Sequence, residues 1–412
     1  MQSEHTRPPL KAWLILGMLC VVGCLNYIDR IMITTMRGSI MEAMPMTDAQ
    51  FGLLSSVFLW VYGVLSPFAG FLADKFKRSQ VIIVSLFVWS AVTWLTAHAG
   101  TYGELLLTRA LMGVSEACYM PAALALIADY HRGPTRSLAT GIHMMGVGLG
   151  QSLGFVGGAL AEQHDWTYAF SLFGGIGIGF AFLLAFGLRD APKQKTESAA
   201  TKEKTDRIGF RNALEKLFGR KEFLLILLFW GLLGVVAWLI VGWLPTFYKE
   251  RFGLSQGTAG LYATGYINVM AMAGVLLGGF LADRWSKVNR GARILVPAIG
   301  MLVAAPAVFV AGYAPVLWLA VGGFMLYGLT KAFTDANMMP VLCMVADERY
   351  RATGYGVLNM CSCIVGGIGL YAGGSLRDAD VPLGLIFQSA SGLMLVCAVL
   401  MFGLNRRLKK GG

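Results

Sequence analysis

The chain has 412 residues, of which 56% are hydrophobic and 14% are charged, and its mean hydropathy is +0.62. Soluble globular domains carry about 25% charged residues, so this composition excludes a soluble enzyme, a disordered protein and a fibre. The positive charges behind the net charge of +11 lie in short loops between apolar runs, a pattern typical of membrane orientation rather than nucleic-acid binding. The seven cysteines lie within apolar segments and show neither a disulfide framework nor zinc spacing. The composition predicts a polytopic α-helical membrane protein.

Runs of apolar residues predict the membrane spans. A helix needs about 20 apolar residues to cross the bilayer, and twelve runs of the chain reach this length. The first run has no small-residue cleavage site, so we expect it to be retained rather than removed as a signal peptide. The expected spans are about 12–33, 50–73, 79–98, 104–128, 137–160, 167–188, 222–247, 258–282, 293–313, 316–345, 352–374 and 383–404.

The distribution of basic residues predicts the orientation. An even number of spans places both termini on one side of the membrane, and most of the Lys and Arg residues outside the spans fall on that side. Both termini are therefore expected in the cytoplasm. The outer loops hold only Arg37, Lys249, Arg251 and Arg377. The charged segment 189–221 separates six spans in 1–188 from six in 222–412, and we expect it to be a cytoplasmic linker with a short amphipathic helix near FRNALEKLF.

The two halves repeat each other in sequence. GFLADKFK at 70–77, after the second span, recurs as GFLADRWSK at 279–287, after the eighth. Thr47 and Ser255 precede these two spans and are expected to cap them. SEACYMP at 115–121 recurs as TDANMMP at 334–340, so Glu116 and Asp335 occupy equivalent positions. Parallel repeats of six helices predict two bundles related by an axis along the membrane normal.

The loops at 70–77 and 279–287 match the G-x-L-a-D-[RK]-x-[GS]-[RK] signature of the major facilitator superfamily, which the chain resembles over nearly its whole length. This resemblance implies an all-α membrane fold, with 12 transmembrane helices in two pseudo-symmetric six-helix bundles, and transport by alternating access. Within the superfamily, NYIDR at 26–30, R-x-x-x-G-x-x-E-A at 109–117 and WLPT at 243–246 are similar to the anion:cation symporter family. Spinster-like carriers share the first two of these motifs, so those two do not separate the families.

The resemblance also implies roles for particular residues. Arg30 and Arg109 would hold the carboxylate of the substrate, and Asp29 and Glu116 would carry the coupling protons. The cytoplasmic helix ends carry acids beside basic residues, which indicates contacts that gate the cytoplasmic side. The gating candidates are Gly70, Asp74, Lys75, Arg78, Gly279, Asp283 and Arg284.

Ionisable residues inside spans cost about 2.5–3.5 kcal/mol each and are functional candidates when they face the interior. Arg30 and Arg109 lie near the outer ends of spans 1 and 4, so both guanidiniums are expected at one depth, where two forks suit a carboxylate. Glu116 lies two turns from Arg109 on the same helix face, about 10.5 Å along the axis. We expect Glu116 to compete with the anion for Arg109 until a proton neutralises it. The alternative is an ion pair between spans that only stabilises the fold.

Span 10 carries a second set of charges. Lys331 and Asp335 are four residues apart and form either a self-neutralising pair or a contact for a second polar or anionic group of the substrate, with Asp335 as a further coupling acid. Other substrate-binding candidates are polar or aromatic side chains within spans, namely Tyr27, Tyr119, Asn268, Asn337 and Asn359. The glycines of span 5 predict a smooth packing face.

The favoured function is proton-coupled uptake of a small organic anion, such as a sugar acid, by a monomer in the cytoplasmic (inner) membrane. The expected partners are this anion, protons and the lipid bilayer, and no nucleic acid. The sequence shows no nucleotide-binding loop, metal-ligand spacing or nucleophile elbow, so no cofactor, metal or enzyme activity is expected. The alternatives are a spinster-like carrier of lysolipids or hydrophobic solutes, and a membrane sensor that does not transport.

Overall fold

A computed structural model describes residues 10–131, 135–191, 210–347 and 351–411, without the side chains of 70–74, 210, 211, 213, 352, 410 and 411. This part of the chain is helical apart from short connections, and it holds 12 helical segments long and apolar enough to cross a membrane. They agree with the twelve predicted spans to within a few residues at most ends. The predicted domain boundaries at 188–189 and 221–222 stay a prediction.

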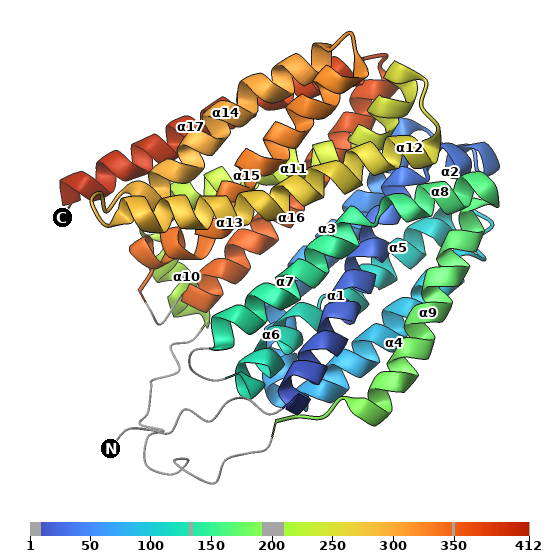
Figure 1. Cartoon of the computed structure of the whole chain (residues 1–412), viewed down its shortest axis with the longest axis horizontal. Helices are drawn as coiled ribbons and strands as arrows, with labels where there is room; N and C mark the ends of the chain where they lie inside the picture. The colour runs from blue at the N-terminus through green and yellow to red at the C-terminus, as the bar shows by residue number, and fades with distance from the viewer. Residues whose placement is uncertain (1–9, 132–134, 192–209, 348–350, 412) are drawn as a thin grey trace.

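The helices form two groups that lie side by side (Figure 1). The N-terminal group contains α1 (Leu10–Thr35), α2 (Arg37–Ala43), α3 (Asp48–Lys75), α4 (Arg78–Thr96), α5 (Tyr102–Glu116), α6 (Tyr119–Tyr130), α7 (Arg136–Ser152), α8 (Phe155–Gln163) and α9 (Trp166–Gly187). The C-terminal group contains α10 (Phe210–Phe218), α11 (Lys221–Phe252), α12 (Gln256–Gly260), the π-helical segment η2 (Leu261–Tyr266), α13 (Ile267–Ser286), α14 (Ala292–Tyr313), α15 (Leu317–Val345), α16 (Arg351–Asp378) and α17 (Leu383–Gly411). The short helix predicted at FRNALEKLF is confirmed as α10.

Span 4 is broken where the sequence predicted a continuous helix. α5 ends at Glu116 and α6 begins at Tyr119. Pro121 has no backbone N–H, so the carbonyl of Ala117, four residues earlier, loses its helical hydrogen bond. The break places Glu116 at the end of a helix, close to the middle of the span. Span 5 is also interrupted, at Leu153 and Gly154.

The predicted caps of spans 2 and 8 are confirmed. The Thr47 hydroxyl accepts a hydrogen bond from the backbone N–H of Gln50 at 3.2 Å, at the start of α3. The Ser255 hydroxyl accepts one from the N–H of Thr258 at 3.3 Å, at the start of α12. Just before it, α11 ends at Phe252, where Gly253 adopts a left-handed conformation with φ of 64°, which favours glycine at helix ends.

Glycines determine how closely α1 approaches α7 and α8. A Cβ on Gly146 or Gly150 would collide with the backbone of Cys20 or Cys24 on α1. Further along, a Cβ on Gly157 would collide with Met32. The packing face predicted for span 5 is therefore confirmed, and it holds α1 in a fixed position inside the N-terminal group.

The two groups meet along several helix pairs, among them α3 with α16, α8 with α12 and α7 with α13. Side chains of α3 bond directly to the backbone of α16: the Ser56 hydroxyl donates to the Gly367 carbonyl at 2.7 Å, and Trp60 Nε1 donates to the Ile364 carbonyl at 3.0 Å. We call this contact region between the two groups the seam.

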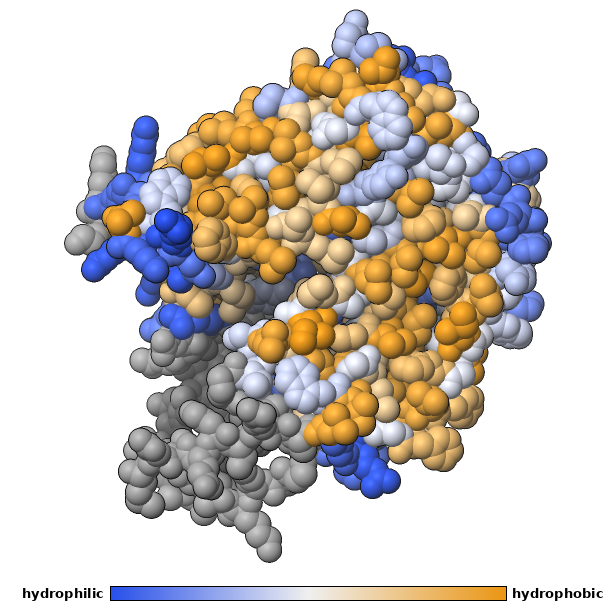
Figure 2. All heavy atoms as spheres, viewed as in Figure 1, coloured by the Kyte–Doolittle hydropathy of each residue, from blue (hydrophilic) through white to orange (hydrophobic). Residues whose placement is uncertain are grey.

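The surface of the molecule is apolar over its middle and hydrophilic toward its ends (Figure 2), as a protein surrounded by lipid requires. The start of α1 and the end of α17 lie toward one end, which we call the terminal end (Figure 1). The opposite end, with α2 and the start of α12, is the distal end. Figure 2 shows a hollow between the two groups toward the terminal end.

Candidate functional site

Four ionisable side chains are buried together in the N-terminal group. Asp29 and Arg30 come from α1, and Arg109 and Glu116 come from α5. Each is between 1% and 6% exposed. When all four are ionised, their formal charges cancel, which reduces the free energy needed to hold charge in a site of low dielectric. We call these four residues the buried charge cluster.

Arg30 is bonded to an acid and surrounded by aromatic rings. Its Nη2 donates to Glu116 Oε2 at 2.8 Å and to Asn26 Oδ1 at 3.4 Å. The guanidinium carbon lies 4.6 Å from the ring centres of both Tyr27 and Tyr62, within the range of cation–π attraction. Both hydrogen bonds leave from Nη2, and the buried Nε has no partner.

Arg109 lacks such a partner. Within the described residues, its one side-chain hydrogen bond runs from Nη1 to the sulfur of Met112 at 2.9 Å, and its Nε has none. A thioether is a weak acceptor. Asp29 and Glu116 lie close enough to attract Arg109 electrostatically, yet neither carboxylate bonds it. Arg109 is therefore a buried cation whose hydrogen-bonding capacity is largely unused.

Both arginines face the seam. The ring of Phe58 on α3 contacts both guanidiniums, with its centre 4.8 Å from Arg30 Cζ and 5.0 Å from Arg109 Cζ. Both side chains also line a small cavity whose other wall is Trp238, Val241, Gly242 and Leu370 of the C-terminal group. The cavity holds about 10 Å³, room for about one water. The structure thus brings together two cations that are 79 positions apart in sequence.

The expected pairing of Glu116 with Arg109 is wrong. Glu116 bonds Arg30 on the neighbouring helix instead. Glu116 and Arg109 lie two turns apart on the same helix, about 10.5 Å along its axis. At this separation the two side chains do not form a short hydrogen bond. α1, held close by the glycines of span 5, supplies a nearer guanidinium.

Asp29 is the second acid of the cluster. Its Oδ2 accepts a 3.4 Å hydrogen bond from the hydroxyl of Thr93 on α4, and its Oδ1 has no partner. Arg109 and Glu116 both act on it electrostatically. An acid with an unsatisfied oxygen beside an under-used cation can take up or release a proton without breaking a strong ion pair.

Lys331 and Asp335 pair with each other on α15. Lys331 Nζ donates to both carboxylate oxygens, at 2.9 and 2.8 Å. Their side chains are 22% and 39% exposed, unlike the buried charge cluster. Tyr355 on α16 is 43% exposed and lies within electrostatic range of Asp335 and of Tyr27 on α1. The pair on α15 therefore remains accessible to water, whereas the buried charge cluster does not.

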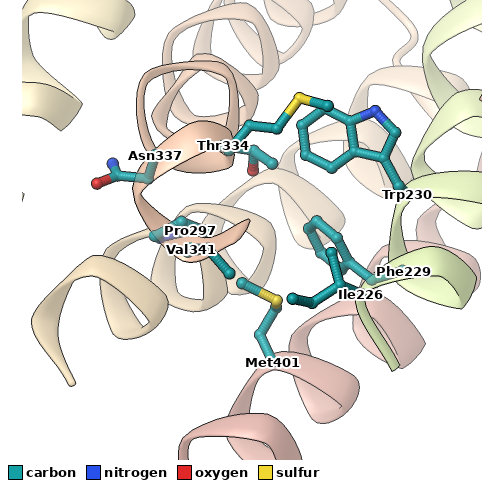
Figure 3. Close-up of a pocket in the computed structure, with 9 residues that line it drawn as sticks. Ile226, Phe229, Trp230, Pro297, Thr334, Asn337, Val341 and Met401 are labelled. Atoms are coloured by element: carbon teal, nitrogen blue, oxygen red, sulfur yellow. The ribbon is translucent and has the colours of Figure 1, made fainter. Parts of the chain in front are cut away.

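The asparagine candidates bond to the protein itself. Asn337 is buried, and its amide nitrogen donates to the carbonyls of Phe333 at 2.9 Å and Gly278 at 3.4 Å. Figure 3 shows its amide directed away from a small apolar cavity within the C-terminal group. Asn268 bonds the Thr264 carbonyl at 2.8 Å, and Asn359 bonds Ser66 across the seam at 3.4 Å. These contacts are structural ones within the protein. The predicted role of the three asparagines in substrate binding stays a prediction.

Tyr119 also differs from expectation. It is fully buried, and its hydroxyl donates to the Leu19 carbonyl on α1 at 2.8 Å. Its ring packs edge-on against Trp89. The aromatic side chain is thus used to pack the terminal half of span 4, where the restart of the helix at Tyr119 turns it toward α1. Tyr27, by contrast, faces Arg30.

The gating candidates lie toward the terminal end. Arg78 forms an ion pair with Asp129, and Asp283 pairs with Arg293 at 3.3 Å. Gly279 has open space where a Cβ would project, and Lys75 and Arg284 are exposed. The side chains of Gly70 and Asp74 lie outside the described residues. Each of these two ion pairs lies within one group of helices, so neither crosses the seam.

Sequence reasoning missed a charged cluster at the distal end. Arg37, Asp48, Glu250 and Arg377 form one network that does cross the seam. Arg37 and Arg377 were read only as loop charges, and Asp48 and Glu250 were assigned no role. The signal that could have found them is the presence of both acidic and basic residues in the outer loops of the two halves.

Known proteins resemble this chain over most of its length. The model of the Major Facilitator Superfamily matches residues 19–370. A protein described as a probable sulfoacetate transporter, SauU, from Cupriavidus necator is 29% identical over 95% of this chain and 93% of its own length. Protein spinster homolog 1 of Xenopus tropicalis is 26% identical, over 93% of this chain and 77% of its own length. An MFS-type efflux pump of Mycolicibacterium smegmatis is 26% identical over 96% and 91%.

Solved structures agree on the fold. A bacterial homologue of the human lysosomal transporter Spinster, in an inward-facing and unoccupied conformation, superposes with a TM-score of 0.81, at 22% identity and 99% coverage of both chains. The inward-facing occupied form gives 0.75. The predicted all-α fold of twelve membrane helices is therefore confirmed.

Proposed function

Because the chain belongs to the major facilitator superfamily, whose members are secondary transporters rather than enzymes, we propose that it is a proton-coupled symporter of a small organic anion. The observation that carries this proposal is the buried charge cluster at the seam, where Arg30 is held by Glu116 and Arg109 has no bonded carboxylate. A guanidinium binds a carboxylate or sulfonate through paired hydrogen bonds. The relative described as a sulfoacetate transporter supports an organic anion as substrate.

Charge balance suggests how protons couple to the anion. The ionised cluster is neutral, so a bound monoanion would add an uncompensated charge to a site of low dielectric. One proton on Glu116 removes its negative charge and releases Arg30 from the 2.8 Å bond. The anion then meets two guanidiniums and restores neutrality. Asp29, beside Arg109, is the second acid available for a further proton.

The terminal end is assigned to the cytoplasm in this proposal. The basic residues of the loops concentrate on the side of the termini, as cytoplasmic loops do. The distal end would then face outward, and uptake would run from the distal to the terminal end across the cytoplasmic membrane. A monomer suffices, because the cluster and the seam lie within one chain.

Spinster-like transport of a lysolipid or hydrophobic solute is the second candidate. It is favoured by the 26% identity to spinster homolog 1 over most of this chain. The charged pair on α15, whose side chains are 22% and 39% exposed, favours a small polar cargo instead. A membrane sensor would bind a ligand without moving it.

Uptake into proteoliposomes tests these candidates. We expect sulfoacetate or an aldonate to accumulate when the outer medium is more acidic than the lumen, and accumulation to stop when a protonophore removes the gradient. Exchange of labelled for unlabelled anion should continue without a gradient. Accumulation of lysolipid alone would favour the second candidate, and binding without exchange would indicate a sensor.

A further inference from the structure

The distal charge network, Arg37, Asp48, Glu250 and Arg377, joins the two groups of helices. Arg377 on α16 donates from Nε to Asp48 on α3 at 2.9 Å, across the seam. Arg37 on α2 also bonds Asp48, and its Nη1 lies 3.4 Å from Glu250 on α11. Two of these ion pairs therefore connect the N-terminal group to the C-terminal group.

Other contacts hold the same region together. The guanidiniums of Arg37 and Arg377 lie 5.8 and 5.6 Å from the ring of Trp243. Asp378 accepts hydrogen bonds from the backbone N–H groups of Asp48 and Ala49, at 2.8 and 2.9 Å. These contacts close the distal end, and the network must break before that end can open.

A cavity of about 400 Å³ borders this network. Its walls come from the distal ends of α11, α14, α16 and α17, and include Glu250, Arg251, Tyr313, Arg377, Leu383 and Gln388. Its volume is in the range of small-molecule sites. It lies at the distal end, whereas Arg30 and Arg109 of the buried charge cluster line a separate cavity at the seam.

The charge of this cavity is unbalanced. Arg377 donates two 2.9 Å hydrogen bonds to Glu250. Arg251, on the same turn of α11 as Glu250, is exposed and makes no ion pair or hydrogen bond of its side chain within the described part of the chain. Two guanidiniums and one carboxylate therefore line the cavity. Arg377 is bonded to Glu250 and also to Asp48, outside the cavity wall, so Arg251 is the cation that has no bonded acid.

We propose that this distal cavity is a second anion-binding site, which takes a soluble oxyanion such as a carboxylate, sulfonate or sulfate between Arg251 and Arg377. The oxyanion offers Arg377 the same acceptor geometry as Glu250, so it competes with Glu250 for that guanidinium. Once Arg377 turns to the anion, its bonds to Glu250 and Asp48 weaken and the distal end opens. An anion that binds in the distal cavity therefore weakens the contacts that keep the distal end closed.

This inference does not depend on proton coupling or on the role of the buried charge cluster. It predicts that Arg109→Gln, which removes a cluster cation, leaves the distal site intact. Arg251→Gln removes the unpaired cation of the distal cavity. Lys249→Gln is the matched control, because it removes an equal charge from the same helical turn and does not line the cavity.

The test uses the full chain in nanodiscs of phosphatidylcholine, with sodium sulfate as the probe at constant ionic strength set by chloride. Calorimetry should show sulfate binding to the unmodified protein, to Lys249→Gln and to Arg109→Gln, and a loss of affinity of about tenfold or more in Arg251→Gln. Spin labels at positions 168 and 316, in a variant without the native cysteines, should report a longer distance between the distal ends when sulfate is added. Both positions are exposed.

Three results would overturn the proposal. If Arg251→Gln and Lys249→Gln lost sulfate affinity equally, the effect would come from general surface charge and not from a specific site. Loss of all sulfate binding in Arg109→Gln would place the anion at the seam. A distance change that required phosphatidylglycerol and did not respond to sulfate would identify a lipid headgroup as the occupant.

Discussion

Arg30 and Glu116 form a 2.8 Å ion pair that is almost completely shielded from water, with side chains 5% and 0% exposed. A buried pair of this kind stabilises only while both partners are charged, because one charge left alone there is strongly unfavourable. A proton on Glu116 therefore changes the state of Arg30 directly. This relationship is the basis of the first prediction.

Glu116→Gln should separate exchange from accumulation. The amide keeps the shape of the carboxyl but can no longer gain or lose a proton, so the anion can still bind without being driven by the proton gradient. We expect anion exchange in proteoliposomes to persist and gradient-driven accumulation to disappear. Asp335→Asn, at the equivalent position of the other half, is the comparison. If Glu116→Gln still concentrated the anion in response to an acidic outside, Glu116 would not be the coupling acid.

Arg109→Lys should weaken anion binding while it preserves the charge. Lysine offers a point charge in place of the planar fork that binds two oxygens at once, and a charge-assisted hydrogen bond contributes about 1.5–3 kcal/mol. The expected result is a rise of about ten- to a hundredfold in the anion concentration needed for half-maximal exchange. The exposed Arg406→Lys serves as control. Equal affinities in the two variants would remove Arg109 from the binding site.

Lys331→Gln should change the discrimination between anions of different charge. Lys331 is partly exposed and is neutralised by Asp335 in the absence of substrate, so a second anionic group of the cargo can replace Asp335 as its partner. We expect the KM for a dianion such as sulfoacetate to rise about tenfold, and the KM for a monoanion such as an aldonate to stay within about twofold. The same shift for both anions would mean that the pair only supports α15.

Gly150→Ala should destabilise the fold, whereas Gly141→Ala should not. A Cβ at 150 meets the backbone of Cys24 on α1, and a Cβ at 141 meets open space. Overpacking of this kind costs about 1–3 kcal/mol, while alanine is otherwise the better helix former. Thermal unfolding in detergent should give a lower Tm for Gly150→Ala and an unchanged or higher Tm for Gly141→Ala. A lower Tm in both would attribute the effect to something other than the approach of α1.

The sequence was sufficient for the spans, the caps and the depth of the two arginines. Each of these depends on local pattern: the length of an apolar run, a hydroxyl before a helix, and the position of Arg30 and Arg109 along their spans. The partner of Glu116 could not be predicted in this way. It depends on the rotation of α1 about its axis, and on the break that Pro121 introduces into span 4.

Contacts between segments far apart in the chain also lay beyond the sequence. Phe58 and Tyr62, which contact Arg30, belong to α3 and look like ordinary apolar positions of a membrane helix. The distal charge network depends on the conformations of loops and helix ends from both halves. Charge counting used Arg37 and Arg377 for orientation and had no means to pair them with Asp48.

The two sets of membrane charges differ in one respect that bears on how such carriers diversify. Arg30 and Glu116 are enclosed by protein, whereas Lys331 and Asp335 remain within reach of water. Replacing one member of the enclosed set would strand its partner in a site of low dielectric, so in the proposed mechanism the proton-coupling step tolerates little variation. Replacing Lys331 and Asp335 together leaves no unpaired charge. In the proposed mechanism, related carriers can therefore change their substrate at this pair while they keep the buried charge cluster unchanged.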